Sequence, residues 1–329
     1  MNRIIVIDRK GGAPTLAEAP QPVADPGPGE VRVRIEAAAL NFADLLMVQG
    51  RYQAMPPFPF VAGLEGAGVV EAAGTGAGLA PGTRVAVSAQ GTLADRAVFP
   101  ADACTPIPDR MPARVAAGFQ IAYGTSHLAL TRSARLAAHE TLVVLGAGGG
   151  VGLTAVEIGA ALGARVIGVA RGADKLDIVR RAGAAEVIDS AEVADLKDAL
   201  KRRGGCEVVY DAVGDAPGLA AFGALKPGGR HLLIGFAGGV PPALPLNHAL
   251  VKNISIHGFY WGGFRTLDPR AMRDSLEALF AMYVDGRLHP VAGAVLPLDR
   301  AAEGYALLAE RRTVGKVILT MTDEATAEG

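Results

Sequence analysis

The chain of 329 residues has only two cysteines, Cys104 and Cys206, which lie far apart in the sequence. Two scattered cysteines exclude a disulfide framework and a four-cysteine zinc lobe, so both are expected to be small buried side chains. Neither sign of charge dominates, because 32 basic residues stand against 33 acidic ones and the formal net charge is −1. This balance argues against a surface built for nucleic acid or membrane.

The sequence also lacks a long hydrophobic run. Its longest stretch without Lys, Arg, Asp or Glu, residues 231 to 251, contains three prolines and several glycines, which a membrane-spanning helix would not carry. The first apolar run has only four residues before Asp8, so it is expected to be a strand and not a signal peptide. We therefore expect a cytoplasmic protein without a membrane partner.

The strongest motif lies in residues 141 to 171. Five β-favouring residues run into a glycine-rich turn, followed by apolar residues at helical spacing and a second apolar run. Strand, glycine turn, helix and strand in this order predict a dinucleotide site, because the helix start directs free N–H groups at a pyrophosphate. Ala147 occupies one glycine position of the G-x-G-x-x-G pattern. The expected phosphate contacts are Gly148, Gly149, Gly150, Val151 and Gly152.

The end of the second apolar run indicates which dinucleotide binds. An acidic residue there would accept hydrogen bonds from the ribose of NAD and repel a 2′-phosphate, but this chain has Arg171, with Lys175 four residues later. NADP(H) is therefore the expected cofactor. The alternative is that both cations are solvated charges at a helix start, where Asp174 would be a cap.

Two domains are expected in an α/β fold. Residues 1 to 120 show short strands and turns, including an alternation of charged and apolar residues over 30 to 37, and predict a β-rich domain. Residues 121 to 264 alternate strands with helices, which predicts a doubly wound Rossmann domain with a parallel sheet of about six strands. Residues 265 to 329 are expected to return to and complete the first domain.

Five short motifs follow one another along the chain. They are Asn41-Phe42-Ala43-Asp44, residues 63 to 68, Tyr123-Gly124-Thr125, residues 146 to 152 and residues 315 to 319. Together with the order of the domains, these motifs resemble the medium-chain dehydrogenase/reductase superfamily. Among its members the chain is most similar to the zinc-independent quinone oxidoreductases, the zeta-crystallin-like branch. The resemblance implies that the β-rich catalytic domain is GroES-like and that the last strand of the Rossmann sheet pairs with its copy in a homodimer.

The zinc-dependent branch of this superfamily has a cysteine at the position of Asn41 and a histidine at that of Leu64. Amide and isobutyl groups cannot replace thiolate and imidazole as zinc ligands, so no metal is expected. Without a Lewis acid, reduction of an acceptor that takes hydride readily is favoured over oxidation of an alcohol.

The resemblance also suggests roles for single residues. Asn41, Asp44 and Tyr52 are the catalytic candidates, with Asn41 near the nicotinamide and the Tyr52 phenol near the substrate. Further cofactor contacts are expected from Thr125, Phe236 and Lys316, and Asp211 to Gly214 should lie near the adenine or ribose. The alternatives are a helix cap for Asn41 and Asp44, a packing role for Tyr52 and an ordinary helix hydroxyl for Thr125.

These features predict an NADPH-dependent oxidoreductase that reduces quinones or α,β-unsaturated carbonyls by hydride transfer without zinc, between the two domains. One alternative is an enoyl thioester reductase of the same fold, for which Arg265, Arg270 and Arg273 could contact an acyl carrier. Another is a low-turnover NADPH-binding protein with a structural or nucleic-acid-binding role. The balanced charge disfavours that last alternative.

Overall fold

The computed structural model describes residues 1–321 and divides into two compact units. The first unit comprises Met1–Ile121 and the segment that begins at Pro290, and the second comprises Ala122–His289. The sequence-based boundary at residues 120 and 121 lies within one residue of the observed one. The return to the first unit follows His289 and not residue 264, because helices α9 (Phe264–Leu267) and α10 (Pro269–Val284) belong to the second unit.

The first unit is rich in β-structure. One sheet has the strand order β2-β1-β4, and the other has the order β15-β16-β3-β5-β6-β8, with β7 also paired to β3. The late strand β16 is antiparallel to β3, so the end of the described chain completes the sheet built from its beginning. The strands are β1 (Arg3–Ile7), β2 (Thr15–Glu18), β3 (Glu30–Leu40), β4 (Phe60–Val61), β5 (Glu65–Ala73), β6 (Arg84–Val87), β7 (Arg96–Pro100), β8 (Cys104–Pro106), β15 (Ala292–Pro297) and β16 (Lys316–Thr320).

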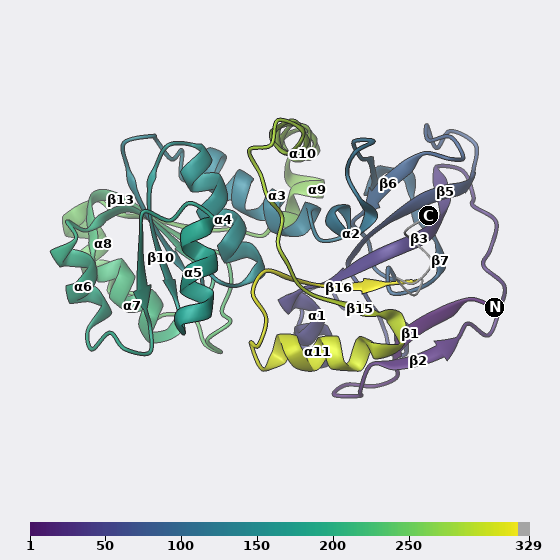
Figure 1. Ribbon diagram of the computed structural model, residues 1–329, viewed down its shortest axis with the longest axis horizontal. Helices are drawn as coiled ribbons and strands as arrows, with labels where there is room; N and C mark the ends of the chain where they lie inside the picture. Colours follow the sequence, from purple (N-terminus) through teal and green to yellow (C-terminus); the bar gives the residue numbers. More distant parts are fainter. Residues whose placement is uncertain (322–329) are drawn as a thin grey trace. The chain divides into compact units, whose positions relative to one another are not determined.

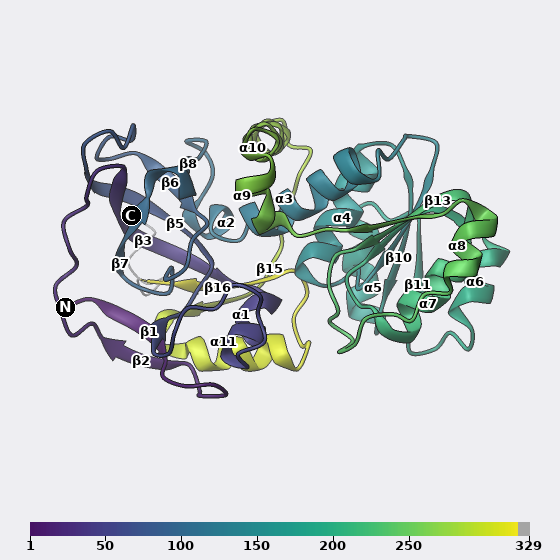
Figure 2. The same cartoon turned by 180° about the vertical axis from the view of Figure 1, so that it is seen from behind.

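Three short helices accompany these strands. Helices α1 (Phe42–Val48) and α11 (Ala301–Ala309) lie side by side, as Figure 2 shows, and α11 also contacts β16. Helix α2 (Ala113–Ala116) packs on β3 and β5. The apolar core enclosed by these elements includes Ile35, Met47 and Tyr305, all almost completely buried.

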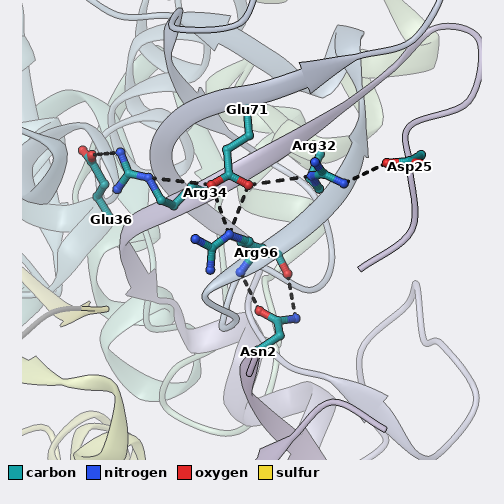
Figure 3. Close-up of polar contacts among 7 residues, drawn as sticks. All are labelled: Asn2, Asp25, Arg32, Arg34, Glu36, Glu71 and Arg96. Carbon is teal, nitrogen blue, oxygen red and sulfur yellow. Dashed lines mark hydrogen bonds and ion pairs between the residues drawn. The ribbon is translucent and has the colours of Figure 1, made fainter. Parts of the chain in front are cut away.

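Strand β3 has the alternation predicted from the sequence. Val31 and Val33 are fully buried, whereas Arg32 and Arg34 point to the other face. On that face the Glu71 carboxylate of β5 contacts three guanidinium groups (Figure 3). Arg96 is the closest of them, at 3.0 Å, and the contacts of Arg32 and Arg34 are 3.7 and 3.9 Å. The outer face of the sheet is therefore held by charge pairs and its inner face by apolar packing.

The second unit is a doubly wound sheet. Six parallel strands have the order β11-β10-β9-β12-β13-β14, which confirms the predicted Rossmann domain. Helices α4 and α5 cover one face, and α6, α7 and α8 cover the other (Figure 1). The strands are β9 (Thr141–Leu145), β10 (Arg165–Ala170), β11 (Glu186–Asp189), β12 (Cys206–Asp211), β13 (Leu225–Leu233) and β14 (Ser255–Gly258). The helices are α3 (Gln120–Leu128), α4 (Gly150–Ala161), α5 (Ala173–Arg181), α6 (Leu196–Arg202), α7 (Asp215–Gly223) and α8 (Leu246–Lys252).

The core of this sheet is built from its central strands. Val143, Leu145, Ile167 and Val209 are buried completely, as expected for parallel strands covered on both faces. Within residues 1–321 no helix has both the length and the apolar composition needed to cross a membrane. Both cysteines are buried, and they form no disulfide with each other.

Candidate functional site

The glycine turn joins β9 to α4 at the carboxyl edge of the parallel sheet, where ligands of such folds bind. Gly146 has a φ of +72°, a conformation that favours glycine. Ala147 has no such requirement, since it lies outside the left-handed region, and its N–H donates to the carbonyl of Val169 at 3.0 Å. The alanine in the motif is thus compatible with the turn.

The start of α4 has the geometry of an anion cradle. No side chain caps the helix at Gly149, so the N–H groups of its first turn are available to a phosphate. A Cβ on Gly152 would lie 2.1 Å from the carbonyl oxygen of Gly146, which makes glycine necessary there. A Cβ on Gly148 would meet only side-chain carbons of Lys175, at 3.3 Å. The residues present therefore fit a dinucleotide pyrophosphate.

Two cations follow β10, one in the turn before α5 and one in the first turn of that helix. Arg171 is exposed and makes no ion pair with another described residue, and Lys175 lies against the glycine turn. The carboxylate of Asp189, at the end of β11, accepts hydrogen bonds from the N–H groups of Gly172 (3.1 Å) and Ala191 (2.8 Å). This acid is thus engaged with backbone groups, and Lys175, one of the two candidate 2′-phosphate ligands, lies beside the cradle.

The loop after β12 is held by a buried pair. Asp211 and His231 are completely buried, with the His231 Nε2 atom 3.0 Å from the Asp211 carboxylate. The other Asp211 oxygen accepts hydrogen bonds from the N–H groups of Val213 and Gly214, at 3.0 and 2.8 Å. A Cβ on Gly214 would lie 2.9 Å from the ring of Phe236. The residues predicted near the ribose and the nicotinamide therefore pack against each other.

Thr125 lies on α3 with 7% of its surface exposed. The adjacent Ser126 donates a hydrogen bond to the carbonyl of Val151 at 2.9 Å, and its oxygen lies 2.8 Å from the hydroxyl of Thr154. The Tyr210 hydroxyl completes this network, 2.9 Å from Ser126. Thr125 is thus carried on a helix that is bonded to the first turn of α4.

In the first unit, Asn41 and Lys316 are brought together. The Lys316 Nζ atom lies 2.6 Å from the Asn41 amide oxygen and 2.7 Å from the Glu65 carboxylate. The Asn41 Nδ2 atom donates to the same Glu65 oxygen at 3.0 Å, and the other Glu65 oxygen accepts from the N–H of Ile121. All three side chains are at least 90% buried. We call Asn41, Glu65 and Lys316 the amide–lysine cluster.

Asp44 is bonded to the backbone of this cluster and caps helix α1. Its carboxylate accepts a hydrogen bond from the Asn41 backbone N–H at 2.8 Å, which leaves the Asn41 side chain to the cluster. Burial raises the pKa of Asp44 from 3.8 to about 7, a rise opposed by its hydrogen bond from Asn41 and by the charge of Lys316. Burial and then the charge of Asp44 hold the pKa of Tyr305 well above its usual range.

Tyr52 is half-buried and packs against the apolar core of the first unit. Among residues 1–321, no three His, Cys, Asp or Glu side chains gather closely enough to hold a metal ion. Glu65 was not among the predicted site residues, although it belongs to one of the motifs. The signal that could have identified it is a single acid between small and apolar residues, since such an acid is buried only when paired.

Comparisons with known proteins agree with this geometry. The alcohol dehydrogenase GroES-like domain family matches residues 27–109, and the zinc-binding dehydrogenase family matches residues 150–318. The chain is 34% identical to a quinone oxidoreductase-like protein 2 homologue of Nematostella vectensis, over 94% of this chain and 86% of that protein.

Two solved structures are similar over 97% of this chain and 100% of theirs. One is the quinone oxidoreductase of Thermus thermophilus, whose complex with NADPH is also known, with 32% identity and a TM-score of 0.85. The other is the Escherichia coli quinone oxidoreductase complexed with NADPH, with 26% identity and a TM-score of 0.89.

A GroES-like unit joined to a doubly wound nucleotide-binding unit defines the medium-chain dehydrogenase/reductase superfamily, and the chain belongs to it. Within that superfamily, the relatives identify the quinone oxidoreductase-like branch. Both the fold and the branch predicted from the sequence are thereby confirmed.

Proposed function

We propose that the protein is an NADPH-dependent reductase of quinones or α,β-unsaturated carbonyls that works without zinc. One observation carries this proposal. The glycine turn leads into a helix whose first N–H groups have no side-chain cap, and the chain also offers the exposed cation Arg171 and, against the glycine turn, Lys175. NADPH complexes of two similar quinone oxidoreductases support the same cofactor here.

The proposed cofactor contacts come from three places in the second unit. The N–H groups of residues 150–152 bind the pyrophosphate, and Arg171 with Lys175 binds the 2′-phosphate. Thr125 and Phe236 contact the nicotinamide end. A bound NADPH supplies the hydride. The chain's own residues bind and orient the cofactor and the acceptor, and they exclude water.

The amide–lysine cluster is proposed to orient the reacting groups from the first unit. The Asn41 side-chain oxygen accepts a hydrogen bond from Lys316, and one N–H of the same amide donates to Glu65. The plane of the amide is therefore fixed, and its second N–H can donate to a ligand. Such fixed dipoles stabilise developing charge without reorganising during the reaction. Tyr52 is proposed to donate a hydrogen bond to the acceptor oxygen, and Asp44 to hold the turn under Asn41.

We also propose a homodimer formed through β14. This strand ends the six-stranded sheet, and the neighbouring helix α8 exposes Leu246, Leu250 and Val251. An open strand edge beside apolar side chains favours pairing with a second copy. Sedimentation velocity of the purified protein tests this proposal, and a monomer at micromolar concentration would reject it. The cytoplasmic location stays a prediction from the sequence.

The test of the activity is NADPH oxidation by the purified, chelator-treated protein. The acceptors are 1,4-benzoquinone, 9,10-phenanthrenequinone, an alkyl enone and crotonyl-CoA, with NADH in parallel. Turnover of quinones or enones with a preference for NADPH is expected. Turnover of the thioester alone would replace the proposal with an enoyl thioester reductase, and tight NADPH binding without turnover would leave a binding protein.

A further inference from the structure

Glu157 is the only charged residue of helix α4, and it is 8% exposed. Its carboxylate accepts a hydrogen bond from the Tyr123 hydroxyl at 2.5 Å and another, short one from the backbone N–H of His289. The His289 Nδ1 atom lies 3.4 Å from the same carboxylate. A buried carboxylate on an apolar helix costs free energy unless such partners are present, so these contacts determine where the side chain lies.

Tyr123 and His289, the two partners of Glu157, lie at the two ends of the second unit. The chain enters the second unit between Ile121 and Ala122 and leaves it between His289 and Pro290. Tyr123 is therefore the second residue of the second unit, and His289 is its last. One carboxylate thus holds the second-unit ends of both connections, although its partners are 166 residues apart, 289 minus 123.

Glu157 also lies on the helix proposed to bind the cofactor. It follows Gly150, the first residue of α4, by seven positions, which is about two helical turns. A helix transmits displacement along its axis because its hydrogen-bonded backbone is stiff. The phosphate-binding turn and the two chain connections are consequently attached to a single rigid element.

We propose that Glu157 is a positioning residue that ties both connections between the units to the cofactor-binding helix. The inference rests on the proposed function, because its kinetic consequence requires NADPH-dependent turnover. Turnover, as proposed above, needs residues of both units, so it should depend on how firmly the two connections are held. Loss of the carboxylate should therefore lower kcat far more than it lowers affinity for NADPH, since the glycine turn itself is unchanged.

Two independent measurements test the proposal on the full-length protein. Hydrogen exchange reports the protection of the His289 amide and of the amides at 123–125. Titration with NADPH and steady-state kinetics report Kd and kcat separately. For Glu157→Ala we expect exchange of the His289 amide to be at least about tenfold faster. We expect kcat to fall by about tenfold while the Kd for NADPH changes by less than about threefold.

Three variants separate the carboxylate's role from general damage. Glu157→Gln keeps an acceptor for the His289 N–H and a polar partner for Tyr123, so it should restore most of the protection and of kcat. His289→Ala removes the imidazole but keeps the backbone donor, so it should resemble the wild type. Tyr123→Phe removes the hydroxyl that donates to Glu157 and keeps the ring, so it should release the amides at 123–125 and leave that of His289 protected.

The outcomes are decisive in either direction. Wild-type exchange at His289 in Glu157→Ala, or an unchanged kcat, would overturn the proposal. So would a Glu157→Gln variant as impaired as the alanine variant. If Glu157→Ala does not fold, Tyr123→Phe decides, because normal exchange at 123–125 would contradict the assignment. If the wild type reduces no acceptor, the proposed function fails. The exchange measurements then still test whether Glu157 holds Tyr123 and His289.

Discussion

The ammonium group of Lys316 lies 2.6 Å from the amide oxygen of Asn41, although 275 residues separate them in the sequence. Both groups also contact the Glu65 carboxylate, so a cation, an amide and an anion share one buried position. The Asn41 side chain therefore has a defined orientation before any ligand arrives. Low exposure strengthens each of these contacts and makes the loss of one partner costly.

Replacing Lys316 with Met should destabilise the protein strongly. The Glu65 carboxylate is 1% exposed, and without the ammonium group it becomes a buried charge with no cation. The expected loss in the free energy of unfolding is about 3–5 kcal/mol, measured by urea denaturation of the two proteins. The double variant Glu65→Gln/Lys316→Met serves as the control and should recover part of that loss. Equal losses in both variants would show that the charge of Glu65 is unimportant.

Asp44 should make the protein less stable as the pH rises. Its pKa in the folded state is about 7, above the ordinary value of 3.8, so the folded state binds the proton more tightly than the unfolded chain. The stability that protonated Asp44 contributes is complete below the unfolded-state value and is lost as the pH rises through about 7. Asp44→Asn keeps an acceptor for the Asn41 N–H but does not titrate.

The measurement for Asp44 is urea unfolding of both proteins at several values between pH 5 and 8. The free energy of unfolding of Asp44→Asn, relative to that of the wild type, should increase across this range. A difference that does not change with pH would show that Asp44 ionises normally. Other titrating groups act on both proteins and cancel in the comparison.

Two alanine substitutions in the glycine motif should differ in their effect on NADPH binding. Gly152→Ala would place a Cβ 2.1 Å from a backbone oxygen, so the turn must distort and the Kd for NADPH should rise by at least about tenfold. Gly148→Ala would meet only the flexible side chain of Lys175, so it should change the Kd by less than about threefold. Fluorescence titration with NADPH measures both. Similar losses at the two positions would argue against the cradle described here.

Lys175 should determine the preference for NADPH over NADH. Lys175→Ala removes one of the two cations proposed for the 2′-phosphate, so the Kd for NADPH should rise by about tenfold while that for NADH stays within about twofold. Arg180→Ala, near the end of the same helix, where Arg180 forms an ion pair with Asp177, makes the same change in net charge. It should leave both constants unchanged. Equal weakening of both dinucleotides in Lys175→Ala would mean that the lysine does not contact the 2′-phosphate.

Glu71→Gln should be a mild substitution that depends on salt. The carboxylate is 25% exposed and faces three arginines, so its removal leaves like charges together on the sheet surface. Exposed pairs contribute little, and the expected loss is about 1 kcal/mol at low ionic strength, decreasing in about 1 M NaCl. Thermal unfolding at both salt concentrations measures it. A larger loss at high salt would exclude a Coulombic cause.

The sequence was informative where the pattern is local. The alternation of Val31 and Val33 with charged neighbours predicted the two faces of β3, and the order of apolar runs around Gly146 predicted a parallel sheet. Helix α10 begins directly after Asp268, whose carboxylate caps it by accepting a hydrogen bond from the Ala271 N–H. These features depend on periodicity and capping, which a single sequence displays.

Features that depend on distant contacts could not be read in this way. The pairing of Glu65 with Lys316 joins residues 251 positions apart, and no spacing rule connects them. The return of the chain at Pro290 was placed too early, because residues 265–284 lie mostly in helices α9 and α10, and a helical pattern does not reveal which unit it packs against. No sequence pattern indicates that the charge of Asp44 acts on Tyr305, because in sequence Tyr305 is one apolar position of a helix.

The strand that carries Lys316 has a consequence for the order in which the protein folds. During synthesis, residues 1–121 emerge first, but their sheet lacks β15 and β16 until the ribosome has made everything up to Thr320. The intervening residues 122–289 form a complete unit and can fold while the first segment waits. The nascent chain should therefore acquire its doubly wound fold before Asn41 meets Lys316, and the amide–lysine cluster should assemble only after Lys316 has emerged.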